Sequence, residues 1–245
     1  MEITNVEKGV ITPYGEPSGP ITHGRLHDQE VVFLARHGVG HFLPPHRVNY
    51  RANLWALREA GAHRILAINA VGGINSDLGP GRIAIPEQII DYTSGRDHTY
   101  FDGGPELISS FPQTSSEKAA IQVTHVDFTY PYCMALRAQL LAAAAVAGVD
   151  IYFGGTYGAT QGPRLESKAE IDRMERDGCH MVGMTGMPEA ALSRELGLRY
   201  ACCAVVANWA AGRGEASIEI EAIERVLHTA MNEVHTLMES FTRGL

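Results

Sequence analysis

The chain has 245 residues, of which 45% are hydrophobic and 20% are charged, and its formal net charge at pH 7 is -8. This length and composition predict one α/β domain with a sizeable core. The acidic balance argues against a nucleic-acid partner, because nucleic-acid binders usually carry a basic patch that neutralises phosphates.

Nothing in the sequence indicates a membrane or an export route. The longest apolar run, at 140–149, is too short to span a bilayer. The first twenty residues lack the charged and apolar regions of a secretory signal. The four cysteines show no spacing typical of a metal site, and we interpret them as buried, reduced thiols: Cys133, Cys179, Cys202 and Cys203. We therefore expect a cytoplasmic protein.

Apolar runs alternate with helical patterns along the chain. In chain order, the predicted elements are a strand at 30–38, a helix at 46–61, strands at 64–73 and 82–92, a helix at 133–147, a strand at 151–157, a helix at 166–177, a strand at 180–185, a helix at 188–197, a strand at 199–207 and a helix at 217–241. Pro86 suggests an edge position or a bulge. The stretch 93–120 predicts a long loop, of a length uncommon unless functional or mobile. This order implies a single α/β domain whose central, parallel or mixed β-sheet is flanked by helices.

Polar residues stand at the ends of several predicted strands, where ligands bind in such sheets. They are Arg36 and His37, Asn69, the segments 161–166 and 183–189, and Asn208. Each has an ordinary structural explanation, such as a surface ion pair for Arg36 or a turn for Asn208. Their joint occurrence at strand ends favours a small-molecule enzyme.

Four segments carry a resemblance to a known family. They are ARHGVGHFLPPHRVNYRANLWALREAG at 35–61, NAVGGI at 69–74, QGPRLESKAEI at 161–171 and VGMTGMPEAALSRELG at 182–197. They resemble the trimeric purine nucleoside and methylthioadenosine phosphorylases. The resemblance extends from about Thr12 to Asn208. The resemblance implies phosphate attack on the anomeric carbon of a purine nucleoside, with phosphate as co-substrate and no cofactor. It also implies a homotrimer with the active site near the subunit interface.

The same resemblance implies roles for individual residues. It implies phosphate contacts for Arg36, His37, His41, Asn69 and Thr185, and catalytic roles for Arg36, His37 and Asn208. It implies nucleoside contacts for Ala70, Gly72, Leu165, Glu166, Met184, His125, Ile218 and Asn208, with His125 supplied by the neighbouring subunit. The planar donor fork of an arginine suits phosphate oxygens.

The start of the chain departs from the family pattern. Family members usually open with a strand and a glycine-rich turn whose hydroxyl residue helps to hold phosphate. This chain opens with MEITNVEKGVITPYGEPSG, which aligns only after that element. We therefore expect a single domain over 1–245 that lacks the N-terminal strand and phosphate loop, because the start is truncated or because the loop is truly absent.

Two residues predict the preferred base. By the resemblance, Asn208 faces purine N7 and the 6-substituent, and Glu166 faces N1. An amide donates to O6 while accepting from a protonated N7, and a carboxylate accepts from N1–H, so the pair suits hypoxanthine or guanine. Adenine presents an acceptor at N1, and unsatisfied buried polar groups would disfavour it.

The segments ARHG, VNYRANLWAL and GPRLE are more similar to the methylthio-nucleoside branch, which has an apolar 5′ pocket. Ile218 or Ile220 would line that pocket. An apolar 5′ pocket, together with Asn208 and Glu166 as contacts to a 6-oxopurine, predicts 5′-methylthioinosine as substrate. The alternatives are a methylthioadenosine phosphorylase, an inosine or guanosine phosphorylase, and a nucleoside-binding protein with weak or no catalysis. A hydrolytic nucleosidase is disfavoured, because it gains nothing from phosphate-binding Arg36 and His37.

Overall fold

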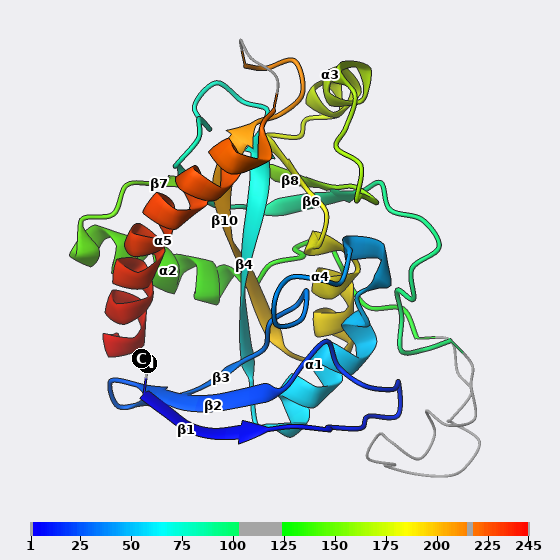
Figure 1. Cartoon of the computed structure of the whole chain (residues 1–245), viewed down its shortest axis with the longest axis vertical. Coiled ribbons are helices and arrows are strands. Elements are labelled where there is room, and N and C mark those ends of the chain that lie inside the picture. The colour runs from blue at the N-terminus through cyan, green and yellow to red at the C-terminus, as the bar shows by residue number, and fades with distance from the viewer. Residues whose placement is uncertain (1, 103–123, 215–217, 245) are drawn as a thin grey trace.

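The computed structural model describes residues 2–102, 124–214 and 218–244. These residues form a seven-stranded sheet, a separate three-stranded sheet and five α-helices (Figure 1). Within them, no helix combines the length and apolar character needed to cross a membrane. Part of the predicted loop at 93–120 lies outside the described residues.

The seven-stranded sheet is mixed, with the strand order β6-β8-β9-β4-β10-β5-β7. Its strands are β4 (Arg64–Gly73), β5 (Ile83–Ile85), β6 (Gln88–Asp91), β7 (Ile151–Phe153), β8 (Thr156–Ala159), β9 (Met181–Gly183) and β10 (Arg199–Trp209). The two longest strands, β4 and β10, pair in parallel along their length, whereas β9 runs antiparallel to β4. The predicted α/β class and mixed central sheet are confirmed.

Helices cover both faces of this sheet. On one face, α1 (Tyr50–Glu59) and α4 (Gly186–Glu195) share an apolar core with alternate residues of β4 and β10. On the other face, α2 (Met134–Ala147) and α5 (Ile220–Arg243) pack on the intervening residues of β10. Every residue from Tyr200 to Ala207 is therefore buried, as expected of a central strand with helices on both sides (Figure 1). A smaller helix, α3 (Lys168–Arg176), closes a third cluster beside β9.

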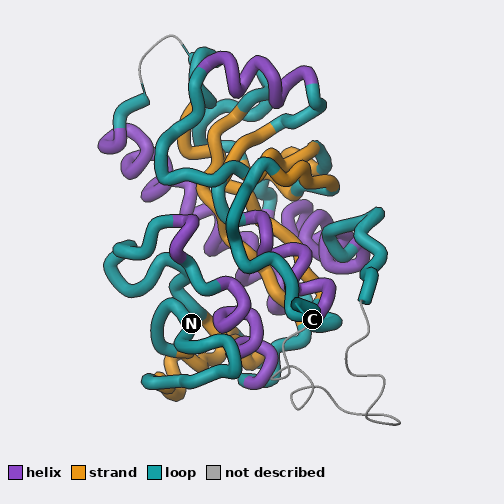
Figure 2. The backbone as a smooth tube through the Cα atoms, turned by 90° about the vertical axis from the view of Figure 1, so that its right-hand side faces the viewer, coloured by secondary structure: helices purple, strands orange, loops and turns teal. Residues whose placement is uncertain are grey.

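The three-stranded sheet is antiparallel and lies at one end of the long axis of the molecule (Figures 1 and 2). It contains β1 (Glu2–Glu7), β2 (Ile21–Leu26) and β3 (Gln29–Phe33). The predicted strand at 30–38 is therefore wrong in its extent, because the strand ends at Phe33 and pairs with β2 in a hairpin. The polar residues after it lie in turns, where Gly38 has a φ of 77° and His41 a φ of 57°.

Three other predicted elements differ from the structure for local reasons. The predicted strand at 82–92 divides into β5 and β6 around Pro86, and the one at 151–157 divides into β7 and β8 at a glycine pair. Both glycines have positive φ, 126° and 82°, which L side chains rarely adopt: Gly154 and Gly155. The predicted helix at 46–61 starts only at Tyr50, after a short 3-10 turn (Pro45–Arg47), because the Asn49 side chain caps it by accepting from Ala52 N.

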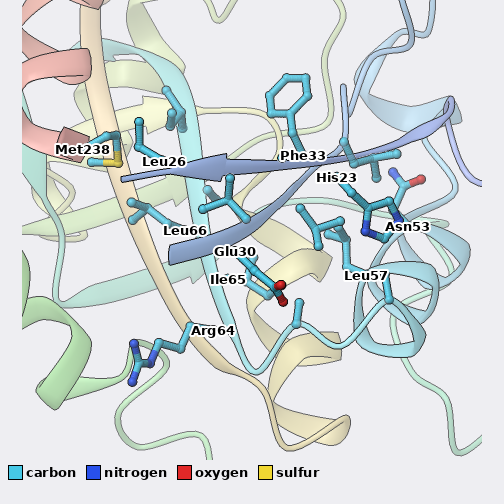
Figure 3. Close-up of a pocket in the computed structure, with 18 of the residues that line it drawn as sticks. His23, Leu26, Glu30, Phe33, Asn53, Leu57, Arg64, Ile65, Leu66 and Met238 are labelled. Atoms are coloured by element: carbon cyan, nitrogen blue, oxygen red, sulfur yellow. The ribbon is translucent and has the colours of Figure 1, made fainter. Parts of the chain in front are cut away.

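One edge of β4 is largely unpaired in the described residues. β9 pairs with it only at Gly72 and Gly73, so no described strand lies against the edge from Arg64 to Val71. A groove of about 1180 Å³ runs along this edge, between β4 and β3. Figure 3 shows side chains from β2, β3, α1, β4 and α5 around it, among them Leu26, Phe33, Leu57, Leu66 and Met238.

Candidate active site

Three predicted phosphate residues meet near the middle of the large sheet. Arg36 follows β3, Asn69 lies on β4, and Thr185 stands at the start of α4. Arg36 Nη2 donates to Asn69 Oδ1 at 3.1 Å, and Asn69 Nδ2 donates to Thr185 Oγ1 at 3.1 Å. A fourth residue, Glu189 of α4, accepts from Arg36 Nε at 2.6 Å and from Nη2 at 3.0 Å. The side chains thus form one continuous network.

The charge of Arg36 is stabilised by this network. Burial opposes the charged form, but the Glu189 carboxylate beside it raises the pKa of Arg36 above its ordinary value. Tyr200 donates to the same carboxylate at 2.8 Å, and burial keeps the pKa of this phenol well above its usual range. Arg36 Nη1 donates to Ile68 O at 3.3 Å. Of the five N–H groups of a guanidinium, one on Nη1 therefore remains to bind an anion.

Two histidines lie beside Arg36. The rings of His37 and His41 are stacked, with centroids 4.3 Å apart. His37 Nδ1 lies 2.7 Å from Leu43 O, and because a carbonyl can only accept, the proton is on Nδ1. Burial, with smaller contributions from His41 and Arg36, lowers the pKa of His37. His37 Nε2 is then an acceptor, suited to a protonated phosphate oxygen.

Glu166 is held by a threonine at the end of β8. Thr160 Oγ1 donates to Glu166 Oε1 at 2.6 Å. The backbone N–H of Thr160 donates to Gly183 O at 2.8 Å, which ties this end of β8 to the end of β9. One carboxylate oxygen is thus occupied by the hydroxyl, and Oε2 can accept from a ligand.

A register shift in β10 sets the direction of the Asn208 side chain. The parallel register of β10 with β4 shifts between Val206 and Asn208, so that Asn208 lies opposite Gly72. A bulge of this kind redirects a side chain. Asn208 Nδ2 donates to Trp209 O at 2.7 Å, which fixes the orientation of the amide because the carbonyl can only accept. The second N–H and Oδ1 can face a ligand.

The predicted sugar residues lie on the adjoining strand ends. Met184 follows β9, and its side chain packs so closely on Gly162 that a Cβ there would collide with its sulfur. Ala70 is exposed on β4. Gly72 packs against Ala210, the residue that follows β10, and a Cβ at Gly72 would approach Ala210 Cα to 3.3 Å, a contact tighter than most. A side chain at either glycine would therefore crowd neighbouring protein atoms, so the backbone packs closely here.

The remaining three predicted residues lie at the surface of the single chain. Leu165 is 39% exposed, His125 is exposed and Ile218 is half-buried. Within the described residues, no hydrogen bond or ion pair connects them to Glu166, Asn208 or the phosphate residues.

Sequence reasoning missed four side chains that contact residues of this site. Thr160 donates to Glu166, Glu189 accepts from Arg36 and from Tyr200, and Arg96 donates to the main-chain oxygens of Thr160 and Met184. Glu189 lies within the segment 183–189, but the helix dipole alone accounts for an acid at the start of a helix, so its position in the sequence indicates no further role. Arg96 falls in the predicted long loop, and a single arginine among Ser, Gly and Asp gives no pattern to detect. Only the tertiary contacts reveal these residues.

The groove beside β4 meets the candidate site at one end only. Arg36, His37, His41 and Glu189 line it, whereas Glu166 and Asn208 do not. The groove therefore leads away from the phosphate residues along β4 and is separate from the predicted base pocket.

Known proteins share both the sequence and the fold. Residues 3–243 match the model of the phosphorylase superfamily. A protein of Xanthomonas campestris pv. campestris named probable S-methyl-5'-thioinosine phosphorylase is 59% identical over 236 residues, which cover 96% of this chain and 88% of that protein. The 6-oxopurine nucleoside phosphorylase of Pyrococcus furiosus is 48% identical over 206 residues, which cover 84% of this chain and 73% of that protein.

A solved structure gives the same picture at lower identity. Methylthioadenosine phosphorylase from Schistosoma mansoni, in complex with adenine, is similar with a TM-score of 0.89 and 29% identity. The similarity covers 98% of this chain and 85% of that one.

Proposed function

We propose that this chain, which belongs to the phosphorylase superfamily, cleaves 5′-methylthioinosine with phosphate. The products are hypoxanthine and 5-methylthioribose 1-phosphate. A phosphate oxygen forms a bond to the anomeric carbon while the bond from that carbon to purine N9 breaks. The electron pair leaves with the base, which takes up a proton from water at N7, and the phosphate gives up one proton to water, so the charges balance. Phosphate is the co-substrate, and the proposal includes no metal or other cofactor.

The fixed hydrogen-bonding pattern of Asn208 and Glu166 carries this proposal. With one N–H held by Trp209 O, the amide offers its other N–H to O6 and its oxygen to a protonated N7. With Oε1 held by Thr160, the carboxylate offers Oε2 to N1–H. Hypoxanthine satisfies all three groups, whereas adenine has no hydrogen on N1.

The network around Arg36 supports the phosphate end of the proposal. The remaining N–H on Arg36 Nη1 donates to a phosphate oxygen, and Nε2 of neutral His37 accepts from a protonated phosphate oxygen. Thr185 and Asn69 add neutral polar groups. An anion held beneath the sugar stabilises the positive charge that develops on the ribosyl ring in the transition state.

We propose a homotrimer in which His125 of a neighbouring subunit completes the sugar end. His125 is exposed in the single chain, as expected for a side chain that acts across an interface. Large apolar side chains near the site are also exposed, including Val39 at 70% and Phe42 at 67%. With Ile218, such a surface can enclose an apolar 5′-methylthio group.

The groove beside β4 fits the strand and glycine-rich turn that the resemblance to the family implies. A strand placed there would pair with the open edge of β4 and end beside Arg36 and His37. Its glycine-rich turn would add backbone N–H donors to the phosphate site. We propose that a segment of this kind binds in the groove when it is supplied.

We also propose a cytoplasmic location for the enzyme. All four cysteines are free thiols, which fits a reducing compartment. The thiols do not enter the proposed reaction.

The first experiment measures release of hypoxanthine and adenine from 5′-methylthioinosine, methylthioadenosine and inosine, each with and without phosphate. We expect rapid, phosphate-dependent release from methylthioinosine. Comparable turnover of methylthioadenosine, the named substrate of the Schistosoma relative, would contradict the base assignment. Preference for inosine would contradict the apolar 5′ pocket. Binding without phosphate-dependent release would favour a nucleoside-binding protein.

A further inference from the structure

Arg96 is a buried arginine whose donors all bind neutral oxygens. It is 8% exposed. Nε donates to Gln161 Oε1 at 3.1 Å, and Nη2 donates to Thr160 O at 3.1 Å and Gln161 O at 2.8 Å. Nη1 donates to Met184 O at 2.8 Å and Met187 O at 2.6 Å. All five N–H groups are thus used.

No carboxylate forms an ion pair with Arg96 in the part of the chain that the structure describes. The guanidinium instead lies over the ring of Tyr50, 5.5 Å from its centroid, and its Nη1 is 3.3 Å from the Tyr50 hydroxyl. A buried cation is costly unless its surroundings compensate for the loss of water. A contribution to stability therefore explains a buried Arg96 less well than the main-chain carbonyls that its guanidinium holds together.

The gathered carbonyls belong to the two segments that carry the predicted substrate residues. Thr160 and Gln161 lead from β8 to Glu166, and Thr160 also donates directly to the Glu166 carboxylate. Met184 belongs to the segment between β9 and α4, which also contains Thr185. Arg96 thus holds the segment 160–166, which contains Glu166, and the segment 184–185, which contains Met184 and Thr185, at a fixed separation.

We propose that Arg96 is a positioning residue that sets the location of Glu166 relative to Met184 and Thr185, and thereby the selection between purine bases. This inference rests on the proposed function. A lysine cannot replace the fork, because one ammonium has three donors and cannot reach four carbonyls in a plane.

The test compares wild type with Arg96→Lys and Arg96→Gln. In each, kcat/KM is measured for methylthioinosine and for methylthioadenosine. We expect both variants to lose about 100-fold in kcat/KM for methylthioinosine, the loss that a misplacement of about 1 Å can produce. The ratio of the two kcat/KM values should also fall about tenfold, because a displaced Glu166 no longer distinguishes N1–H from an acceptor. This ratio does not depend on how much of the sample is folded.

Arg137→Lys is the matched control. Arg137 is also 8% exposed, but it lies on α2, against Phe153 and near Glu87. Its replacement should lower the unfolding midpoint without changing the ratio. If Arg96→Lys does not fold, Gln161→Met removes the side-chain oxygen that accepts from Arg96 Nε and from Ser94 N, leaves the four main-chain acceptors of Arg96 in place, and should shift the ratio in the same direction by a smaller factor.

Folded Arg96 variants with a wild-type ratio would overturn the inference and leave Arg96 a structural role. A wild type that prefers methylthioadenosine would contradict the proposed function alone. In that case, a loss of the preference for methylthioadenosine in Arg96→Lys would still support the positioning role. A variant that kept this preference would still overturn the positioning role.

Discussion

Asn208 shows how the exact path of a strand determines the chemistry of a side chain. The preceding residues of β10 are buried on both faces, and the register shift after Val206 turns Asn208 toward the position opposite Gly72. The bond to Trp209 O then fixes which atom of the amide donates. The local backbone, and not the residue type alone, therefore determines which atoms of this amide can face a ligand.

Exchanging both readers should move the base preference toward adenine. In Asn208→Asp combined with Glu166→Ser, a carboxylate accepts from the adenine amino group and a hydroxyl donates to N1. We expect the ratio of kcat/KM for methylthioinosine over methylthioadenosine to fall at least about 100-fold, at roughly 1 to 3 kcal/mol for each mismatched group. The measurement is the same pair of assays. Each single variant serves as a control and should shift the ratio only in part, and an unchanged ratio in the double variant would refute the assignment.

The sequence placed Arg36, Asn69 and Thr185 among the predicted phosphate residues because they lie within the segments that resemble the family. The structure joins Arg36, Asn69 and Thr185 into one network. Arg96 and Glu189 were not predictable, because the residues that they contact lie far away in the chain. Arg96 donates to carbonyls more than sixty positions away, and the Glu189 carboxylate that Tyr200 donates to also accepts from Arg36, 153 positions away.

At the scale of elements, hydropathy located most strands and helices but not their ends. The strands at 82–92 and 151–157 were each predicted as one, since apolar patterns continue across the turns that divide them. The exposed strand β1 (Glu2–Glu7) has no buried face, so periodicity could not reveal it. No local pattern could show that β3 pairs with β2 and not with β4, which leaves one edge of β4 largely unpaired.

That open edge predicts the effect of an added strand. We expect a fusion that places an apolar strand and a glycine-rich turn before Glu2 to lower the KM for phosphate about tenfold, since added N–H donors to a charged oxygen are worth about 1.5 kcal/mol or more. A fusion of equal length with prolines in the strand is the control, because proline cannot donate to a strand edge. Phosphate saturation curves compare the two, and equal KM values would exclude the groove as the place of this strand.

At the scale of the whole molecule, the family resemblance is confirmed by the match over residues 3–243 and by relatives that share most of their length with this chain. The described fold brings the phosphate residues together within one chain. It leaves His125 and Leu165 at the surface, away from the network that Arg36 forms. An active site shared between subunits would reconcile these two observations.

Subunit mixing tests whether the site is shared. Arg36→Ala and His125→Ala should each be nearly inactive alone. Co-expressed in equal amounts, they should recover about a quarter of wild-type activity, because random assembly into a closed ring pairs an intact Arg36 with an intact neighbouring His125 at about one site in four. Arg36→Ala co-expressed with His37→Ala is the control and should recover none, since both residues come from the same subunit. Recovery in neither mixture would place His125 outside the neighbour's site, and light scattering on the purified protein would show whether three copies assemble.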